Sequence, residues 1–285
     1  MQQNIALLWI RDGVMIDRMH INAIAFALSY YTFILPEAQL QISLAKLINY
    51  AFLKSGYSCL DKIKFFNKDY GTNLIDIDTT NDYYNALASA AAKYAQYFPG
   101  IIEILHNLSD NGIKNFITSA ISQNVLAIWA KSQQGKLSSK YITQILGSRE
   151  NFTKGFDHFN FIKEKYKIDK IIFVADAISE IAMASNYAHQ FNITPIGFAN
   201  VITIDKIIAD LKNVYELTKS LPVLPPYPLT TLPKLKADEI LLPDQDELIK
   251  ALYTNGAKVV VSADASNSIV DNLKAYLAVI NLKQL

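Results

Sequence analysis

The chain has 285 residues, of which 51% are hydrophobic and 19% charged, and its 27 Lys and Arg against 26 Asp and Glu leave a net charge of +1. This composition indicates a globular protein with a sizeable core, and it excludes a polybasic surface for nucleic acid or membrane. A single cysteine, Cys59, excludes an internal disulfide and a cysteine-rich zinc site. No apolar run reaches the ~20 residues of a membrane helix, and the Met-Gln-Gln-Asn start lacks the basic flank of a signal peptide, so we expect a cytoplasmic protein.

The first buried strand is predicted at residues 5–10, where six apolar residues run without interruption into Arg11, Asp12 and Gly13. Such a run is typical of a central strand in a parallel sheet, which is covered on both faces. Ligands of open α/β folds bind at the carboxyl ends of these strands, so Arg11 and Asp12 lie at the expected functional edge. An Asp-Gly pair at this point is also ordinary turn chemistry.

Residues 18–97 show helical periodicity and no convincing strand. One apolar face is marked by Ala23, Phe26 and Tyr30, which are spaced three to four residues apart. A later helix is expected to begin at Asn81, a good N-cap, and to continue through an alanine-rich stretch. A helical segment of this length between two α/β units indicates an insertion outside the sheet, either a cap over a site or a packing domain without a gating role.

The α/β pattern resumes at residues 98–100, Phe-Pro-Gly. A helix is predicted over 101–111 and a second buried strand over 114–119, which ends in Thr118 and Ser119. A Thr-Ser pair at the end of a strand often caps the next helix instead of binding a ligand.

Three further charged positions stand out along the chain. Lys154 precedes a predicted helix, and a solvated surface lysine is the plain alternative for it. A third core strand over 170–176 ends in Asp176, and Glu180 follows one helical turn later. Two carboxylates at this spacing suit a hard cation such as Mg²⁺, and they also suit the dipole of a helix N-terminus.

The rest of the chain is predicted to complete the α/β core. A strand is expected over 193–198 and a helix over 203–218. Residues 221–234 hold five of the nine prolines, which prevents helix and central strand and favours extended chain. Residues 256–285 are predicted to add one more strand and helix.

Taken together, the motifs resemble those of the haloacid dehalogenase (HAD) superfamily of phosphohydrolases over residues 5–252. The matching stretches are Asp-Gly-Val-Met-Ile-Asp from Asp12, Pro-Gly…Thr-Ser to Ser119, Lys154-Gly155, and Asp176 with Glu180. The resemblance implies an α/β fold: a three-layer Rossmann-like core with a parallel sheet and an inserted all-α cap. The core is expected at 1–17 and 98–285, with a proline-rich insertion at 221–234 and an extra strand and helix at 256–285, and the cap at 18–97. Residues 236–252 resemble the usual end of the family's core, a short edge strand at 236–242 followed by a closing helix.

The resemblance also implies roles for individual residues. The family's general acid/base falls on Asp12, whose backbone carbonyl is a metal ligand, and Asp176 and Glu180 hold the metal. Thr118 and Lys154 are catalytic residues that contact the phosphoryl group, and the remaining expected phosphate-binding residues are Ser119, Arg11 and Gly13. The nucleophile position, however, is occupied by Ile10. Isoleucine cannot attack phosphorus or ligate a metal.

Two functional hypotheses follow. The first is a catalytically impaired HAD-like protein that binds a phosphorylated ligand or acts as a regulatory or assembly module, with Mg²⁺ binding weak or absent. The alternative is an active Mg²⁺-dependent phosphatase or phosphomutase on a small phosphorylated metabolite, with Asp12 as nucleophile or as a base for direct attack by water. A small phosphorylated molecule is the expected partner and nucleic acid and membrane are not, whereas a protein partner or homo-oligomer is left open.

Overall fold

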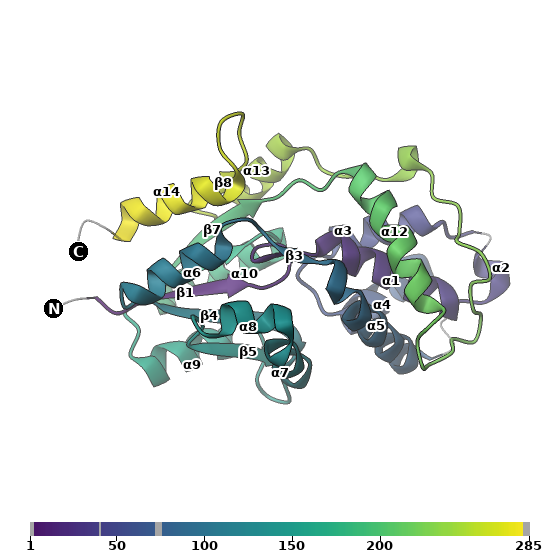
Figure 1. The fold of residues 1–285 in the computed structure, drawn as a ribbon, viewed down its shortest axis with the longest axis horizontal. Coiled ribbons are helices and arrows are strands. Elements are labelled where there is room, and N and C mark those ends of the chain that lie inside the picture. Colours follow the sequence, from purple (N-terminus) through teal and green to yellow (C-terminus); the bar gives the residue numbers. More distant parts are fainter. Residues whose placement is uncertain (1–2, 40, 72–75, 282–285) are drawn as a thin grey trace. The chain divides into compact units, whose positions relative to one another are not determined.

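The computed structural model describes residues 3–39, 41–71 and 76–281 (Figure 1). Its centre is a six-stranded parallel sheet in the order β5-β4-β1-β6-β7-β8. In chain order the strands are β1 (Ile5–Ile10), β4 (Lys114–Ser122), β5 (Gln144–Ser148), β6 (Lys170–Ala175), β7 (Ile193–Ala199) and β8 (Val259–Ser262). The predicted parallel α/β fold class is confirmed.

Strand β1 is central because its side chains are apolar on both faces. Its residues from Ala6 to Trp9 are fully buried, and the one polar atom among their side chains, the Trp9 indole nitrogen, donates to Asn115 Oδ1 at 3.0 Å. The strand pairs with β4 on one side and β6 on the other, so that Ile10 lies opposite Thr118 and Trp9 opposite Val174. The carboxyl ends of β1, β4 and β6 therefore lie at the same edge of the sheet. This is the topological switch point, because β4 and β6 lie on opposite sides of β1.

Helices cover both faces of the sheet. On one face α6 and α14 are linked by an ion pair between Lys274 and Glu103 at 2.9 Å. On the other, α9 contacts α11 and α10 contacts α11 and α13. The core helices are α6 (Ile101–Asp110), α7 (Gln123–Lys131), α8 (Gln133–Ser139), α9 (Phe156–Tyr166), α10 (Ile178–Asn186), α11 (Ala188–Phe191), α13 (Gln245–Thr254) and α14 (Ile269–Asn281).

A second compact unit is helical, apart from single residues of two short strands at its border, β2 (Ile16–Asp17) and β3 (Gln96–Tyr97). Its helices are α1 (Met19–Phe33), α2 (Pro36–Gln39), α3 (Leu44–Leu53), α4 (Cys59–Tyr70), α5 (Ile77–Ala91), α12 (Ile204–Thr218) and the single turns η1 (Ala92–Tyr94) and η2 (Ala237–Glu239). Helix α5 begins four residues before the predicted start because the Asp76 carboxylate accepts from the N–H groups of Asp78 and Thr79. No described helix is long and apolar enough to cross a membrane.

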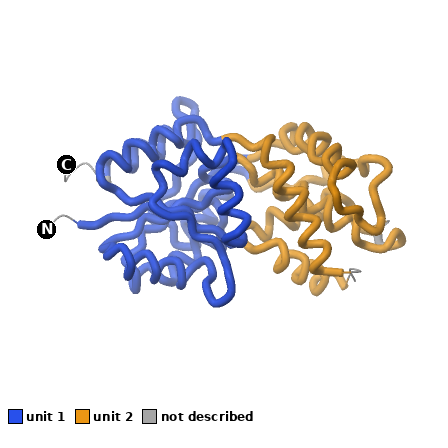
Figure 2. The backbone as a smooth tube through the Cα atoms, turned by 60° about the horizontal axis from the view of Figure 1, so that its bottom comes forward, with its two compact units in different colours: residues 1–16, 97–201, 244–285 blue, residues 17–96, 202–243 orange. Residues whose placement is uncertain are grey.

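The division into units differs from the predicted domains in one segment (Figure 2). Residues 202–243, expected in the core, cluster with 17–96, whereas 1–16, 97–201 and 244–285 form the α/β unit. Polar side-chain contacts join this segment to the helical unit. His20 on α1 is hydrogen-bonded to Asp210 on α12 at 2.7 Å, and Lys206 forms an ion pair with Asp17. The proline-rich stretch follows the same unit, where the Tyr227 N–H donates to the Thr32 carbonyl at 3.2 Å.

The predicted edge strand at 236–242 is wrong. This segment contains η2, and its backbone bonds a side chain instead of the sheet: Asn49 donates to the Glu239 carbonyl at 2.8 Å and accepts from the Leu241 N–H at 2.9 Å. An asparagine amide offers the same donor and acceptor as a neighbouring strand. The edge strand next to β7 is instead β8, which lies within 256–285, where an additional strand and helix were predicted.

Candidate active site

The loop after β1 folds tightly around Gly13. The Arg11 carbonyl accepts from the N–H groups of Met15 and Ile16, and the Gly13 N–H donates to the Ile16 carbonyl at 2.8 Å. Gly13 has a φ of +95°, and a Cβ at this position would overlap the Asp176 carboxylate. Only glycine fits here, so the loop brings the tips of β1 and β6 together. The single donor of Gly13, its N–H, is engaged within the loop.

The tip of β1 carries an aliphatic side chain. Ile10 is the last residue of the strand, is buried, and lies opposite Thr118 in the register of β1 and β4. It offers neither charge nor lone pair to this edge of the sheet, where its neighbours are polar.

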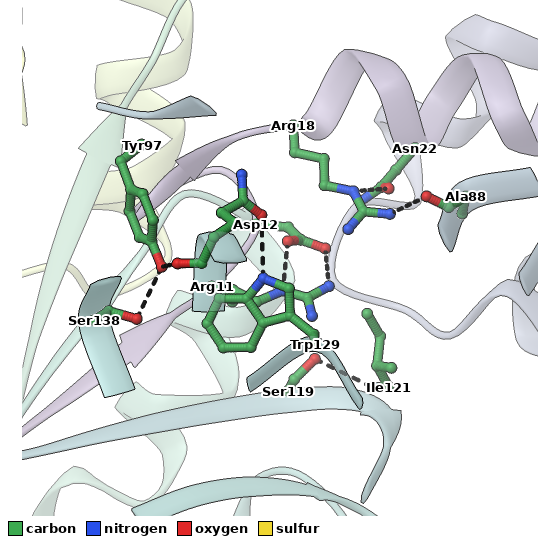
Figure 3. A network of polar contacts seen from close by, with 11 residues as sticks. Arg11, Asp12, Arg18, Asn22, Ala88, Tyr97, Ser119, Ile121, Trp129 and Ser138 are labelled. Atoms are coloured by element: carbon green, nitrogen blue, oxygen red, sulfur yellow. Dashed lines mark hydrogen bonds and ion pairs between the residues drawn. The ribbon is translucent and has the colours of Figure 1, made fainter. Parts of the chain in front are cut away.

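Arg11 and Asp12 form a bidentate ion pair directly after that tip (Figure 3). The guanidinium donates from Nε to Asp12 Oδ1 at 2.7 Å and from Nη2 to Oδ2 at 2.9 Å. Arg11 is only 2% exposed, and its Cζ lies 5.0 Å from the ring centroid of Trp129. A planar guanidinium held by a carboxylate and an aromatic face is a strong, directional contact.

Hydrogen bonds fix the aromatic side of this network. The Trp129 indole N–H donates to the Gln134 side chain at 3.1 Å, and the Tyr97 hydroxyl donates to Ser138 Oγ at 2.8 Å (Figure 3). Burial raises the pKa of Tyr97, while the Ser138 bond and the charge of Arg11 act in the opposite direction. Tyr97 therefore stays a neutral donor, and Trp129 is held in place beside Arg11.

A second buried ion pair lies at the neighbouring strand end. Lys154, before α9, pairs with Glu180 in the first turn of α10, and the two side chains are 8% and 7% exposed. Asp176, just after β6, is also buried, and its Oδ2 has no hydrogen-bond partner among the described residues, nor has Glu180 Oε2. Burial, then the charge of Glu180, raises the pKa of Asp176 well above its ordinary value; Lys154 lowers it and Asp12 raises it.

Thr118 contacts a residue for which the sequence predicted no role. Its Oγ1 lies 2.7 Å from Nδ1 of His158, which is fully buried in the first turn of α9. Burial, followed by the charge of Lys154, lowers the pKa of His158 to about 4. The imidazole is therefore neutral at neutral pH.

No family model and no curated protein sequence matches the chain. Solved structures do: a hydrolase from Pseudomonas syringae matches with a TM-score of 0.60 at 15% identity over 96% of this chain and 98% of that one. A haloacid dehalogenase-like family hydrolase from Streptococcus pneumoniae matches with a TM-score of 0.55 at 13% identity, covering 96% and 98%. A HAD family hydrolase from Deinococcus radiodurans, solved with bound phosphate and sodium, matches with a TM-score of 0.53 at 17% identity, covering 96% and 94%.

The chain has the HAD-like fold. Its sequence has diverged far from these structures, so the likeness concerns the fold and leaves the chemistry to the residues present.

The HAD-like core brings most of the predicted site residues to one edge. Asp176 lies against Gly13, its pKa responds to Asp12, Lys154 and Glu180, and Lys154 and Glu180 are directly paired. The other predicted residues lie beside the tip of β1: Thr118 within β4 opposite Ile10, Arg11 on Asp12, and Ser119, whose Oγ accepts from the Ile121 N–H at 3.2 Å. His158, Trp129 and Tyr97 were not predicted, since nothing in their local sequence marks them.

The residues at this edge of the sheet do not form a complete set for Mg²⁺. Hard cations need several oxygen ligands, and among the described residues no three acidic, histidine or cysteine side chains are placed to hold a metal. The Asp12 carboxylate is paired with Arg11 and the Glu180 carboxylate with Lys154. The Ile10 side chain has no atom that could ligate a metal. The unpaired oxygens of Asp176 and Glu180 are the remaining acceptors.

The stability of the HAD-like unit should depend on pH through His158. The folded pKa of about 4 lies below the ordinary 6.5, so between these values the unfolded chain binds a proton that the folded protein does not. The neutral His158 side chain therefore makes its full contribution to stability above pH 6.5. The free energy of unfolding falls by about 3 kcal/mol as the pH drops toward 4. Urea unfolding of the wild type and of His158→Phe at pH 7.5, 5.5 and 4.5 measures this. Equal pH slopes for the two proteins would contradict it.

Proposed function

We propose that this protein binds a small phosphorylated molecule at the carboxyl edge of its sheet without passing the phosphoryl group to the protein. The observation that carries the proposal is Ile10 at the tip of β1, beside a set of groups suited to an anion. Covalent phosphoryl transfer needs an anionic nucleophile at that tip, and an aliphatic side chain cannot supply one.

Cations and a hydroxyl support the binding half of the proposal. Arg11 and Lys154 are both buried, and Thr118 lies between their strand ends. Arginine recognises phosphate oxygens in a bidentate manner, and lysine neutralises charge as a point donor. Each cation already has a carboxylate partner, Asp12 or Glu180, which keeps it in place and balances its charge until an anion takes over the contact.

The state of Asp12 supports the non-catalytic half. Both of its carboxylate oxygens accept hydrogen bonds from Arg11, whose guanidinium packs on Trp129. A nucleophile or general base must turn a lone pair toward the reacting atom, and this pairing opposes that. The incomplete ligand set for Mg²⁺ points the same way, because a metal would otherwise neutralise the phosphate and position it. Weak or absent Mg²⁺ binding is therefore part of the proposal.

Binding of inorganic phosphate, measured by calorimetry, tests this function. We expect the wild type to bind phosphate without Mg²⁺ and Arg11→Met to bind it roughly ten-fold more weakly, because a charge-assisted contact is lost. Asp12→Asn should bind roughly ten-fold more tightly, because the internal anion that occupies the Arg11 guanidinium is removed while its shape is kept. The change in phosphate affinity thus has opposite directions in the two variants. A residue that merely supports the fold would not increase the affinity when it is replaced.

Lys167→Met is the control, since Lys167 is an exposed cation that pairs with Glu164 just before β6 begins, at the amino edge of the sheet. It should leave the phosphate affinity unchanged. A wild-type protein that binds no phosphate, or an Asp12→Asn variant that binds it less well, would refute the proposed role of this edge.

A further inference from the structure

Thr118 and His158 form a buried polar pair whose members come from different elements, β4 and α9. Thr118 is 1% exposed and His158 0%, and Oγ1 and Nδ1 are 2.7 Å apart. Breaking this bond would leave two polar atoms unpaired and out of reach of water, which is costly. The pair therefore fixes the Thr118 hydroxyl in one direction, whereas a lone hydroxyl would turn among its staggered positions.

The imidazole is held in place by its surroundings. The Phe152 ring packs on it at a centroid distance of 4.7 Å, and Phe159 next to it in the helix is fully buried. Burial and the Lys154 charge keep the ring neutral, with the Gly147 backbone and Asp157 acting in the opposite direction. A neutral imidazole has one N–H and one lone pair, so its bond to Thr118 has two hydrogen arrangements.

The two arrangements differ in what Thr118 offers to a ligand. If Nδ1–H donates to Oγ1, the hydroxyl proton is available to an acceptor; if Thr118 donates to Nδ1, only lone pairs remain. A bound phosphate favours the first, because each donor in the chain from imidazole to hydroxyl to phosphate oxygen strengthens the next. Nε2 makes no hydrogen bond among the described residues, whereas Nδ1 lies within hydrogen-bond distance of Thr118 Oγ1.

We propose that His158 is a positioning residue that donates from Nδ1 to Thr118 and so directs the Thr118 hydroxyl proton to a phosphate oxygen of the bound ligand. This inference rests on the proposed binding function. His158 does not contact the phosphate itself; it acts through Thr118 alone.

A double-mutant cycle on the full chain tests this, with inorganic phosphate as the probe and calorimetry as the measurement. Thr118→Val and His158→Phe should each weaken phosphate binding by ~3- to 10-fold, the range for one neutral hydrogen bond. The double variant should bind no more weakly than Thr118→Val, because His158 has nothing left to position. His158→Asn should keep most of the affinity, since its amide carries an N–H near the place of Nδ1.

Phe152→Leu is the control for packing, because it alters the contact with the imidazole and leaves the hydrogen bond in place. It should shift the melting temperature and not the phosphate affinity. The imidazole ¹⁵N–¹H correlation spectrum of the phosphate-saturated wild type should show the proton on Nδ1.

Three results would overturn the inference. Fully additive losses in the cycle would show that His158 does not act through Thr118, and a proton on Nε2 would show that Thr118 is the donor within the pair. A wild type that binds phosphate together with either of these refutes the inference alone. A wild type that binds no phosphate refutes the proposed function, and the inference with it.

Discussion

We expect Ile10→Asp to show Mg²⁺-dependent phosphatase activity and the wild type to show none. The wild type lacks a nucleophile at the tip of β1, and loss of a nucleophile costs several orders of magnitude in rate. An aspartate at this position would supply both the attacking oxygen and a further oxygen ligand beside Asp176, next to the Thr118 strand end. Hydrolysis of a panel of sugar phosphates, with and without Mg²⁺, measures the gain.

Ile10→Asn is the matched control, because it has the size of aspartate without its charge and should remain inactive. Since Ile10 is buried, melting temperatures of both variants show whether the fold is retained. The opposite pattern, in which the wild type turns over briskly and Asp12→Asn abolishes turnover, would identify Asp12 as the nucleophile. It would also refute the proposal of a binding protein without phosphoryl transfer.

Lys154→Met is expected to destabilise the α/β unit by about 3 kcal/mol, because it leaves the buried Glu180 carboxylate without its counter-charge. The pair is 8% and 7% exposed, so water does little to screen the loss. The neighbouring Asp176 makes it worse, since that buried carboxyl also lacks a partner for one of its oxygens. Urea unfolding at pH 7.5 gives the difference in the free energy of unfolding.

Adding Glu180→Gln to Lys154→Met should restore most of the lost stability, because residue 180 then no longer carries a buried charge without its partner. Lys219→Met provides the comparison: Lys219 pairs with Glu216 on the surface, where the partners are 49% and 63% exposed, and its loss should not be measurable. A Lys154→Met variant as stable as the wild type would show that the pair does not hold the strand ends together.

The four inner strands of the sheet could be predicted because each is marked in the sequence by a local apolar run, whereas β5 was not predicted. The runs at 5–10, 114–119, 170–176 and 193–198 correspond to β1, β4, β6 and β7. The segment 202–243 was misplaced for the opposite reason. The sequence pattern of an amphipathic helix such as α12 shows which face is apolar, but it does not show which of two cores that face covers. Long-range contacts such as that of His20 with Asp210 determine the core to which the helix belongs.

By itself the sequence determined the parallel α/β fold class and the residues that follow β1 and β6, because hydrophobic period and turn residues act over a few positions. It also determined that Ile10 stands at the tip of β1. Only the tertiary structure decided which charges and hydroxyls meet there: Arg11 with Asp12 under Trp129, and Thr118 with His158. The energy of an ion pair or hydrogen bond depends on the distance between side chains that are far apart in the chain, and local sequence patterns do not give those distances.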